Sequence, residues 1–111
     1  MTAPSNATDP VVVTAIFHPA AGAHDALVAA MAPGIAAVHE EKGCLLYAIH
    51  DAPDGTIVMI EKWETVADLD AHGVGEAVAV FRAGIDGLLA GPAEVTRMVP
   101  IPTGEASRGA I

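Results

Sequence analysis

The sequence predicts an α+β domain in which helices cover one face of a four-stranded antiparallel sheet. Short segments rich in β-branched and aliphatic residues alternate with longer segments whose apolar residues recur at helical spacing, and turn-forming residues separate them. Their order, β-α-β-β-α-β, is the split ferredoxin-like arrangement. The 111 residues are 52% hydrophobic and 17% charged, which suits one compact domain and excludes intrinsic disorder.

The first strand and the first helix follow from a change of pattern. Val11–His18 is an unbroken, mostly apolar run that Pro19 ends, so it predicts a strand. From Ala23 the apolar residues recur at helical spacing, which predicts a helix that Gly43 ends. Pro33 is expected to interrupt and kink this helix, because an internal proline donates no N–H and its ring crowds the preceding turn.

A hairpin is predicted in the middle of the chain. Cys44–Asp51 and Thr56–Glu64 both read as strands, and the Ala-Pro-Asp-Gly segment between them supplies residues that favour a tight turn. The two strands should therefore pair in antiparallel fashion.

The last part of the domain predicts two helices and a strand. Thr65 is expected to cap a short helix that runs to His72, with Asp68 at its third position. Helical spacing resumes over Ala77–Ala90 and stops at a Gly-Pro pair. Ala93–Val99 then predicts the fourth strand.

The folded domain is expected to span residues 10–100. Residues 1–9 predict a flexible N-terminal tail, and residues 101–111, which are rich in turn formers, predict a C-terminal tail. The N-terminus lacks the basic and apolar segments of a signal peptide, and no run reaches the ~18 apolar residues of a membrane span. We therefore expect a cytoplasmic protein.

The predicted strands also indicate an assembly. A sheet with one face in water alternates apolar and polar residues, whereas these strands are apolar on both faces. Helices can cover only one of the faces, so we expect a second copy of the sheet to cover the other in a homodimer. The residues concerned are Val11, Val12, Val13, Ile16, Phe17, Leu45, Leu46, Ile49, Ile57, Val58, Met59 and Ile60.

Composition and motifs exclude several classes of function. With 14 acidic and 5 basic residues the net charge is −9, so the chain should repel nucleic acid. The single cysteine, Cys44, excludes an intrachain disulfide and a multi-thiolate zinc site, and we expect it to be buried and inert. The five histidines have no metal-ligand spacing, and there is no phosphate-binding loop. The only serines, Ser5 and Ser107, lie in the predicted tails, which excludes a serine nucleophile.

Five residues near the third strand form a candidate site. Glu61 and Trp63 are two apart on one strand, so both point to the same side of the sheet. His72 can fold back over that strand, with Tyr47 on the paired strand and Phe81 on the next helix. The spacing also allows purely structural roles, in which Trp63 packs in the core, Glu61 accepts a structural hydrogen bond and His72 caps a helix.

Three segments resemble one family. Glu41-Lys-Gly-Cys-Leu-Leu-Tyr47, then Glu61-Lys-Trp63, then Ala67-Asp-Leu-Asp-Ala-His72 are similar to motifs of the antibiotic biosynthesis monooxygenase family, in the same order. The resemblance covers about residues 11–100. It implies a ferredoxin-like protomer that pairs through its sheet into a dimeric α/β barrel. It also implies oxygenation of phenolic, anthrone or quinol substrates by O₂ without a metal or other cofactor.

The resemblance implies roles for the candidate residues. A deprotonated polyphenol is itself the electron donor to O₂, so the protein must supply an aromatic pocket and a proton acceptor. An imidazole can accept a proton near neutral pH, which suits His72 as the catalytic base. Glu61 is the second catalytic candidate, expected to orient His72 or Tyr47. Trp63, Phe81 and Tyr47 are the candidate substrate-binding residues, the first two flanking the ring.

Departures from the family limit the substrate. Haem-degrading relatives use an Asn, Trp and His set with the asparagine on the first strand, and the only asparagine here is Asn6. Haem degradation is therefore not expected, and a quinol or polyphenol is the better prediction. A different class of function stays open: a non-catalytic dimeric module that binds small ligands or is associated with stress.

Overall fold

The computed structural model describes residues 9–111, so the predicted N-terminal tail lies, except for Asp9, outside the described residues. The elements are β1 (Val11–Phe17), α1 (His24–His39), β2 (Cys44–Asp51), β3 (Ile57–Trp63), α2 (Val66–Gly73), α3 (Glu76–Ile85) and β4 (Glu94–Met98). After β4 the chain continues in turns and bends to its C-terminus. Among the described residues, no helix is long and apolar enough to cross a membrane.

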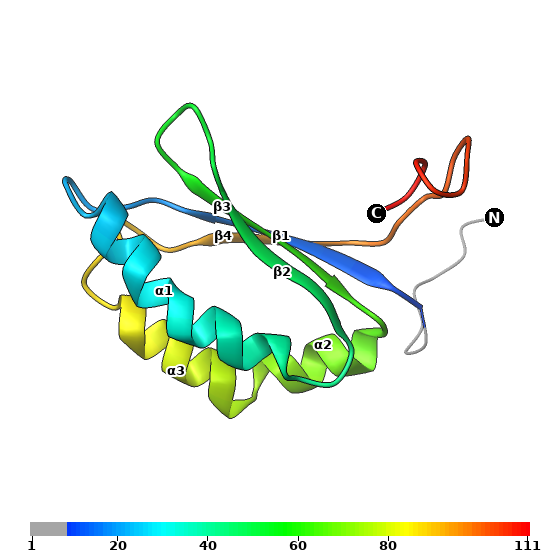
Figure 1. The fold of residues 1–111 in the computed structure, drawn as a ribbon, viewed down its shortest axis with the longest axis horizontal. Coiled ribbons are helices and arrows are strands. Elements are labelled where there is room, and N and C mark those ends of the chain that lie inside the picture. Colours follow the sequence, from blue (N-terminus) through cyan, green and yellow to red (C-terminus); the bar gives the residue numbers. More distant parts are fainter. Residues whose placement is uncertain (1–8) are drawn as a thin grey trace.

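The four strands form one antiparallel sheet in the order β2-β3-β1-β4, with the helices packed on one side of it (Figure 1). This confirms the predicted ferredoxin-like arrangement. The register places four site-facing side chains in one row across the sheet, because each is opposite the next: Tyr47, Glu61, Val13 and Arg97. Partners directly opposite one another share a face, so the row spans the whole sheet.

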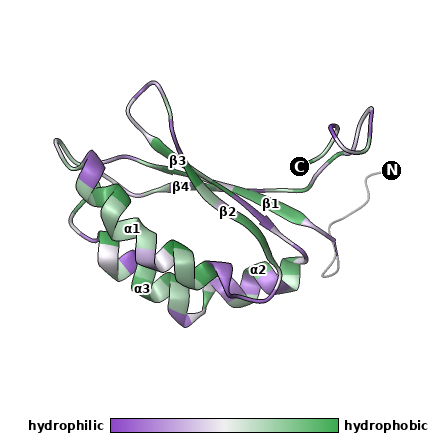
Figure 2. Ribbon diagram, in the orientation of Figure 1, coloured by the Kyte–Doolittle hydropathy of each residue, from purple (hydrophilic) through white to green (hydrophobic). Residues whose placement is uncertain are grey.

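The two faces of the sheet differ in what covers them. On the helix side the core is fully enclosed, with Leu27, Met31, Met59 and Trp63 all at 0% exposure. On the other side none of the described helices packs, although the strands consist largely of hydrophobic residues (Figure 2). Of the side chains on that side only Val12 is buried, and the others are partly buried or exposed. The apolar members of this outer sheet face are Val12, Ile16, Leu46, Ala48, Val58, Ile60 and Met98, and its polar members are Thr14, His50, Lys62, Glu94 and Thr96.

Two predicted helix features differ from the structure. The helix α1 continues through Pro33 to His39, because its inner face packs into the core and stabilises the helix despite the missing N–H. The helix α3 ends at Ile85, five residues before the predicted Ala90, and Gly87 follows with a φ of +82°. A left-handed glycine just beyond the last turn is a common way to end a helix. The residues released from α3 form a loop that borders the candidate site.

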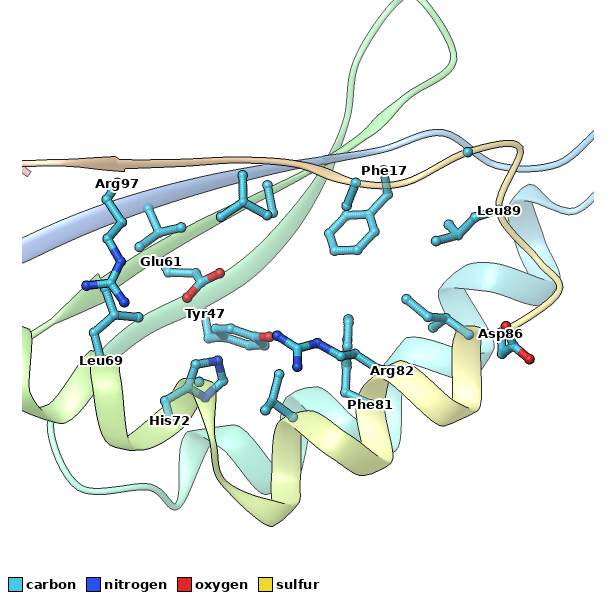
Figure 3. A pocket seen from close by; sticks show the side chains of 18 of the residues that line it. Phe17, Tyr47, Glu61, Leu69, His72, Phe81, Arg82, Asp86, Leu89 and Arg97 are labelled. Atoms are coloured by element: carbon cyan, nitrogen blue, oxygen red, sulfur yellow. The ribbon is translucent and has the colours of Figure 1, made fainter.

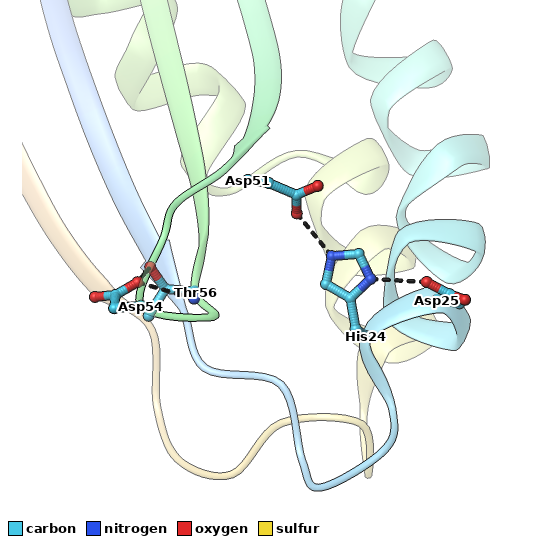
Figure 4. A network of polar contacts seen from close by, with 5 residues as sticks. All are labelled: His24, Asp25, Asp51, Asp54 and Thr56. Atoms are coloured by element: carbon cyan, nitrogen blue, oxygen red, sulfur yellow. Dashed lines mark hydrogen bonds and ion pairs between the residues drawn. The ribbon is translucent and has the colours of Figure 1, made fainter.

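An exposed histidine joins the start of α1 to the end of β2. His24 Nδ1 lies 2.8 Å from Asp25 Oδ1, and its Nε2 lies 2.7 Å from Asp51 Oδ1 (Figure 4). The hydrogen bonds to Asp51 and then to Asp25 raise the pKa of the imidazole above its ordinary value. These bonds form fully only when the ring is protonated, since two carboxylates then face two N–H donors.

This arrangement predicts a pH-dependent contribution to stability. Because the pKa of His24 is higher in the folded state than in the unfolded chain, its contribution is complete below the unfolded value of about 6.5. It should disappear as the pH rises through the folded value. Unfolding free energies of the wild type and His24→Gln should therefore differ at low pH and converge at high pH, and added salt should reduce the difference. A difference that grows with pH would contradict the assignment.

Candidate active site

A cavity of about 560 Å³ lies between the sheet and the helices α2 and α3 (Figure 3). Its inner wall is apolar and includes Phe17, Phe81, Ile85 and Leu89. Its polar lining consists of Tyr47, Glu61, His72, Arg82, Asp86 and Arg97. A volume of this size is within the range of about 300–1,000 Å³ that holds small organic ligands. The most exposed lining residues come from α3, the loop after it and β4, so the cavity opens between those elements.

His72 reaches the cavity from the last turn of α2. The Thr65 hydroxyl accepts a hydrogen bond from the Asp68 backbone N–H, which confirms the predicted cap and fixes where the helix begins. The His72 side chain is only 6% exposed, and its Nδ1 lies 2.6 Å from Glu41 Oε1. An ionised carboxylate can only accept, so in the neutral imidazole Nδ1 carries the proton and Nε2 has the lone pair. Within residues 9–111 Nε2 has no hydrogen-bond partner, and the ring lines the cavity.

Glu41 comes from the connection between α1 and β2. Gly43, two residues later, has a φ of +81°, and a Cβ there would lie 2.2 Å from the Asp68 carboxylate. Only glycine fits both conditions, so the chain can turn close against α2 at this point. The turn in the Glu-Lys-Gly-Cys segment therefore places the Glu41 carboxylate beside the imidazole of His72.

Trp63 lies behind the cavity wall. Its indole is 0% exposed and does not line the cavity, and its ring centroid is 4.6 Å from that of His72 with an interplanar angle of 33°. The expectation that Trp63 flanks the substrate ring directly is therefore corrected. The physical reason is that α2 closes over the end of β3, so the imidazole covers the indole. Phe81, by contrast, does line the cavity.

Glu61 faces the cavity but does not hold His72. Its Oε1 accepts a hydrogen bond of 3.0 Å from the indole N–H of Trp63, and Glu41 takes the position beside His72 that Glu61 was expected to occupy. Burial raises the pKa of the Glu61 carboxyl, while the Trp63 N–H and the charges of His72 and Arg97 oppose that rise. Burial thus favours the neutral form of this carboxyl more than water would, and its oxygens face the cavity, where they can accept a hydrogen bond from a polar ligand group.

Tyr47 stands at the centre of the aromatic contacts. Its ring centroid lies 5.5 Å from His72, 6.2 Å from Phe81 and 6.5 Å from Trp63, all in edge-to-face geometry. The hydroxyl has no hydrogen-bond partner among the described residues, and burial raises the pKa of this phenol strongly. It remains a neutral O–H that faces the cavity and can donate to a ligand oxygen (Figure 3).

Three charged groups in or beside the cavity were not predicted from the sequence. Glu41 lies within the quoted motif, but nothing in the spacing links it to His72, which is 31 residues away. Arg82 and Arg97 line the cavity, whereas Glu41 contacts it only through His72. Because the whole chain has only five lysines and arginines, each of them could have been considered as a candidate for binding an anion.

The remaining candidates do not form a second centre. Burial and the charges of Glu41 and Glu61 raise the pKa of the Cys44 thiol, which makes a thiolate unfavourable there. His18 pairs with Glu94, and His39 donates to the Tyr47 carbonyl. In the part of the chain from Asp9 onward, no three His, Cys, Asp or Glu side chains are grouped closely enough to hold a metal ion.

Comparison with known proteins places this site in a family. A family model described as antibiotic biosynthesis monooxygenase matches residues 10–84. Rv0793 of Mycobacterium tuberculosis, provisionally named a monooxygenase, is 32% identical over 100 residues, which are 89% of this chain and 99% of the relative. Its solved structure has a TM-score of 0.78 at 31% identity and covers 87% of this chain and 100% of that one. PA3566 from Pseudomonas aeruginosa has a TM-score of 0.74 at 25% identity, with coverage of 87% and 99%.

The family match includes the segments that carry the five predicted site residues, and it ends just before Ile85 of the cavity wall. It contains the Glu41–Tyr47 segment, the Glu61 and Trp63 strand, and the helix that carries His72. The fold agrees with that of the two solved relatives over 87% of this chain. The chain belongs to the antibiotic biosynthesis monooxygenase family.

Proposed function

We propose that the protein is a cofactor-independent monooxygenase that oxidises a quinol or polyphenol with O₂. One observation carries the proposal: the His72 imidazole, held by the Glu41 carboxylate through Nδ1, lines a largely apolar cavity with its Nε2 free of any partner among the described residues. This is the arrangement of a general base held in one tautomer. Membership of the family and the provisional monooxygenase name of Rv0793 support the same class of reaction.

The proposed reaction is balanced without a further redox group. His72 Nε2 accepts the proton of one quinol hydroxyl, and the electron-rich anion then forms a bond between a ring carbon and one atom of O₂. The resulting peroxide anion takes back that proton to form a hydroperoxide. The ring C–H proton then leaves as the O–O bond breaks, and it departs together with the released hydroxide as water. The products are a hydroxylated quinone and one water, so one oxygen atom enters the substrate and the four electrons come from the quinol. The protein's part is to bind the ring, exclude water and move protons.

The cavity lining supports a position for the ring. Phe81 and Phe17 form an apolar wall whose ring centroids are 6.0 Å apart, next to Tyr47. A bicyclic aromatic lying against this wall could receive a hydrogen bond from the Tyr47 hydroxyl. Its reacting hydroxyl would then face His72, whose ring centroid is 5.5 Å from that of Tyr47.

The test is O₂ uptake with a reduced naphthoquinol, compared with autoxidation in the same buffer. We expect the protein to accelerate uptake and to place one labelled oxygen atom from O₂ in the quinone product. Both outcomes are needed, since uptake that yields only hydrogen peroxide and unhydroxylated quinone would show an oxidase. No acceleration together with measurable binding of the quinol would refute the oxygenase and favour a non-catalytic ligand-binding module.

We also propose that the protein is a homodimer joined through the outer sheet face defined above. Isoleucine, valine and leucine side chains there are only partly buried by the chain itself, and a second copy would remove them from water. Light scattering at micromolar concentration should give twice the protomer mass. Ile60→Lys, which places a charge in the middle of the face, should give the monomer. Val74→Lys is the matched control, because Val74 is 89% exposed at the end of α2. A monomeric wild type would refute the dimer.

A further inference from the structure

The cavity contains a large share of the chain's positive charge. The whole sequence has five lysines and arginines against 14 acidic residues, and two of the five, Arg82 and Arg97, line the cavity. The rest of a protein with net charge −9 repels anions. A negatively charged ligand would therefore find attraction only where such cations are concentrated.

The two arginines differ in whether their charge is already paired. Arg97 Nη2 lies 2.8 Å from Asp70 Oδ1, so a neighbouring carboxylate offsets its charge. Arg82 forms no ion pair or hydrogen bond with any residue from Asp9 to Ile111. Asp86 is the acidic residue nearest to it along the chain, and Figure 3 shows its carboxylate turned away from the Arg82 guanidinium. Arg82 thus presents an uncompensated cation at the cavity.

The direction of the Arg82 side chain relates this charge to the reacting groups. Figure 3 shows the guanidinium extending from α3 along the cavity toward the hydroxyl of Tyr47. The same proximity appears electrostatically, since the charge of Arg82 opposes the burial that raises the pKa of Tyr47. Tyr47 is in turn the neighbour of His72. An anionic group bound at Arg82 would therefore lie close to Tyr47 and His72. On a quinol substrate this group would be next to the hydroxyl that faces His72.

We propose that the preferred substrate is an aromatic quinol with a carboxylate beside its reacting hydroxyl, and that Arg82 binds this carboxylate. A guanidinium offers two parallel N–H donors that match the two oxygens of a carboxylate. The inference rests on the proposed function for the choice of a quinol ring. The recognition of the carboxylate does not depend on turnover and can be measured alone.

Binding without O₂ provides that measurement. The probes are dihydroxynaphthoate and its methyl ester, which share the ring and the hydroxyls and differ in charge. Their dissociation constants can be followed through the fluorescence of Trp63, the only tryptophan, which packs against His72. We expect the acid to bind about 10- to 100-fold tighter than the ester, as for a hydrogen-bonded charged pair.

Three variants assign the effect to one side chain. Arg82→Gln should abolish the preference for the acid and leave ester binding unchanged, and Arg82→Lys should keep part of it. Arg108→Gln is the matched control: it changes the net charge equally, but Arg108 is an exposed C-terminal residue paired with Glu105. It should keep the full preference.

The other outcomes overturn the inference. Equal binding of acid and ester by the wild type would do so, and so would a preference that survives in Arg82→Gln. If Arg82→Gln lost the binding of both the acid and the ester, Arg82 would be a packing residue of the cavity wall and would not bind a carboxylate. The preference for the acid combined with no O₂ uptake would refute the proposed oxygenation and support the carboxylate site, so the two failures are distinguishable.

Discussion

Replacing His72 should lower the turnover of a naphthoquinol about 10²–10⁴-fold, the usual effect of removing a general base. Two variants separate chemistry from packing. His72→Ala removes the base, but it also leaves the Glu41 carboxylate without its partner and uncovers the Trp63 indole. His72→Gln keeps an N–H near Glu41 and cannot act as a base, so it should be equally slow and closer to the wild type in melting temperature. Steady-state O₂ uptake and thermal unfolding are the two measurements.

Glu41→Gln tests the positioning of that base. The amide can still accept a hydrogen bond from Nδ1, but it has no charge to stabilise the protonated imidazole. We expect a smaller loss of turnover, about 10- to 100-fold, the worth of a hydrogen bond to a charged group. The acidic limb of the pH–rate profile should move to lower pH, which a purely structural role would not cause. Unchanged turnover in His72→Gln would refute the base, and an unmoved profile in Glu41→Gln would refute the positioning role.

Trp63→Ala should have the largest effect on stability, a loss of about 3–5 kcal/mol in the free energy of unfolding. The indole is fully buried, contacts His72 and Tyr47, and satisfies the Glu61 carboxylate. Its removal leaves a cavity and a buried acceptor without a donor. Because the variant has no tryptophan, unfolding should be followed by circular dichroism in denaturant.

Trp63→Phe separates the two causes of that loss. Phenylalanine keeps most of the apolar contact and lacks the N–H, so it should cost about 1–3 kcal/mol, the desolvation penalty of an unsatisfied polar group. The pKa of Glu61 should rise further, since the Trp63 N–H opposes the effect of burial. Val80→Ala, at a position 55% exposed on α3, is a control that should change stability little. A loss in Trp63→Ala no larger than this control would contradict the assigned packing.

Local patterns were sufficient for the fold because each element has its own signal. The β-branched run of β1, the turn residues between β2 and β3 and the Thr65 cap depend on neighbours within a few residues. The predicted end of α3 was wrong, because apolar residues at helical spacing continue after Ile85. In the folded protein they belong to a loop, where Leu89 bridges to Pro19. Periodicity alone could not distinguish these two uses of apolar residues.

The site was determined by the sequence only in part. Strand alternation places Glu61 and Trp63 on one face, and the cavity does contain Tyr47, Glu61, His72 and Phe81. Which polar groups meet is a different question, because it depends on how α2 docks over the end of β3. That docking puts His72 between Trp63 and the cavity and beside Glu41, a residue from another part of the chain. Hydrogen-bond partners at such separations have no local signature, so only the tertiary structure assigned them.

The sequence by itself thus determined the order of the elements, the apolar character of both sheet faces and the residue types available to the site. The tertiary structure decided which carboxylate holds His72, which aromatic ring is core and which is wall, and which arginine is left unpaired. The physical reason is one of range. Hydrophobic periodicity depends on residues that are close together in the sequence. The pairing of charges and the shape of a cavity depend on distances between elements, and these are set only when the helices pack on the sheet.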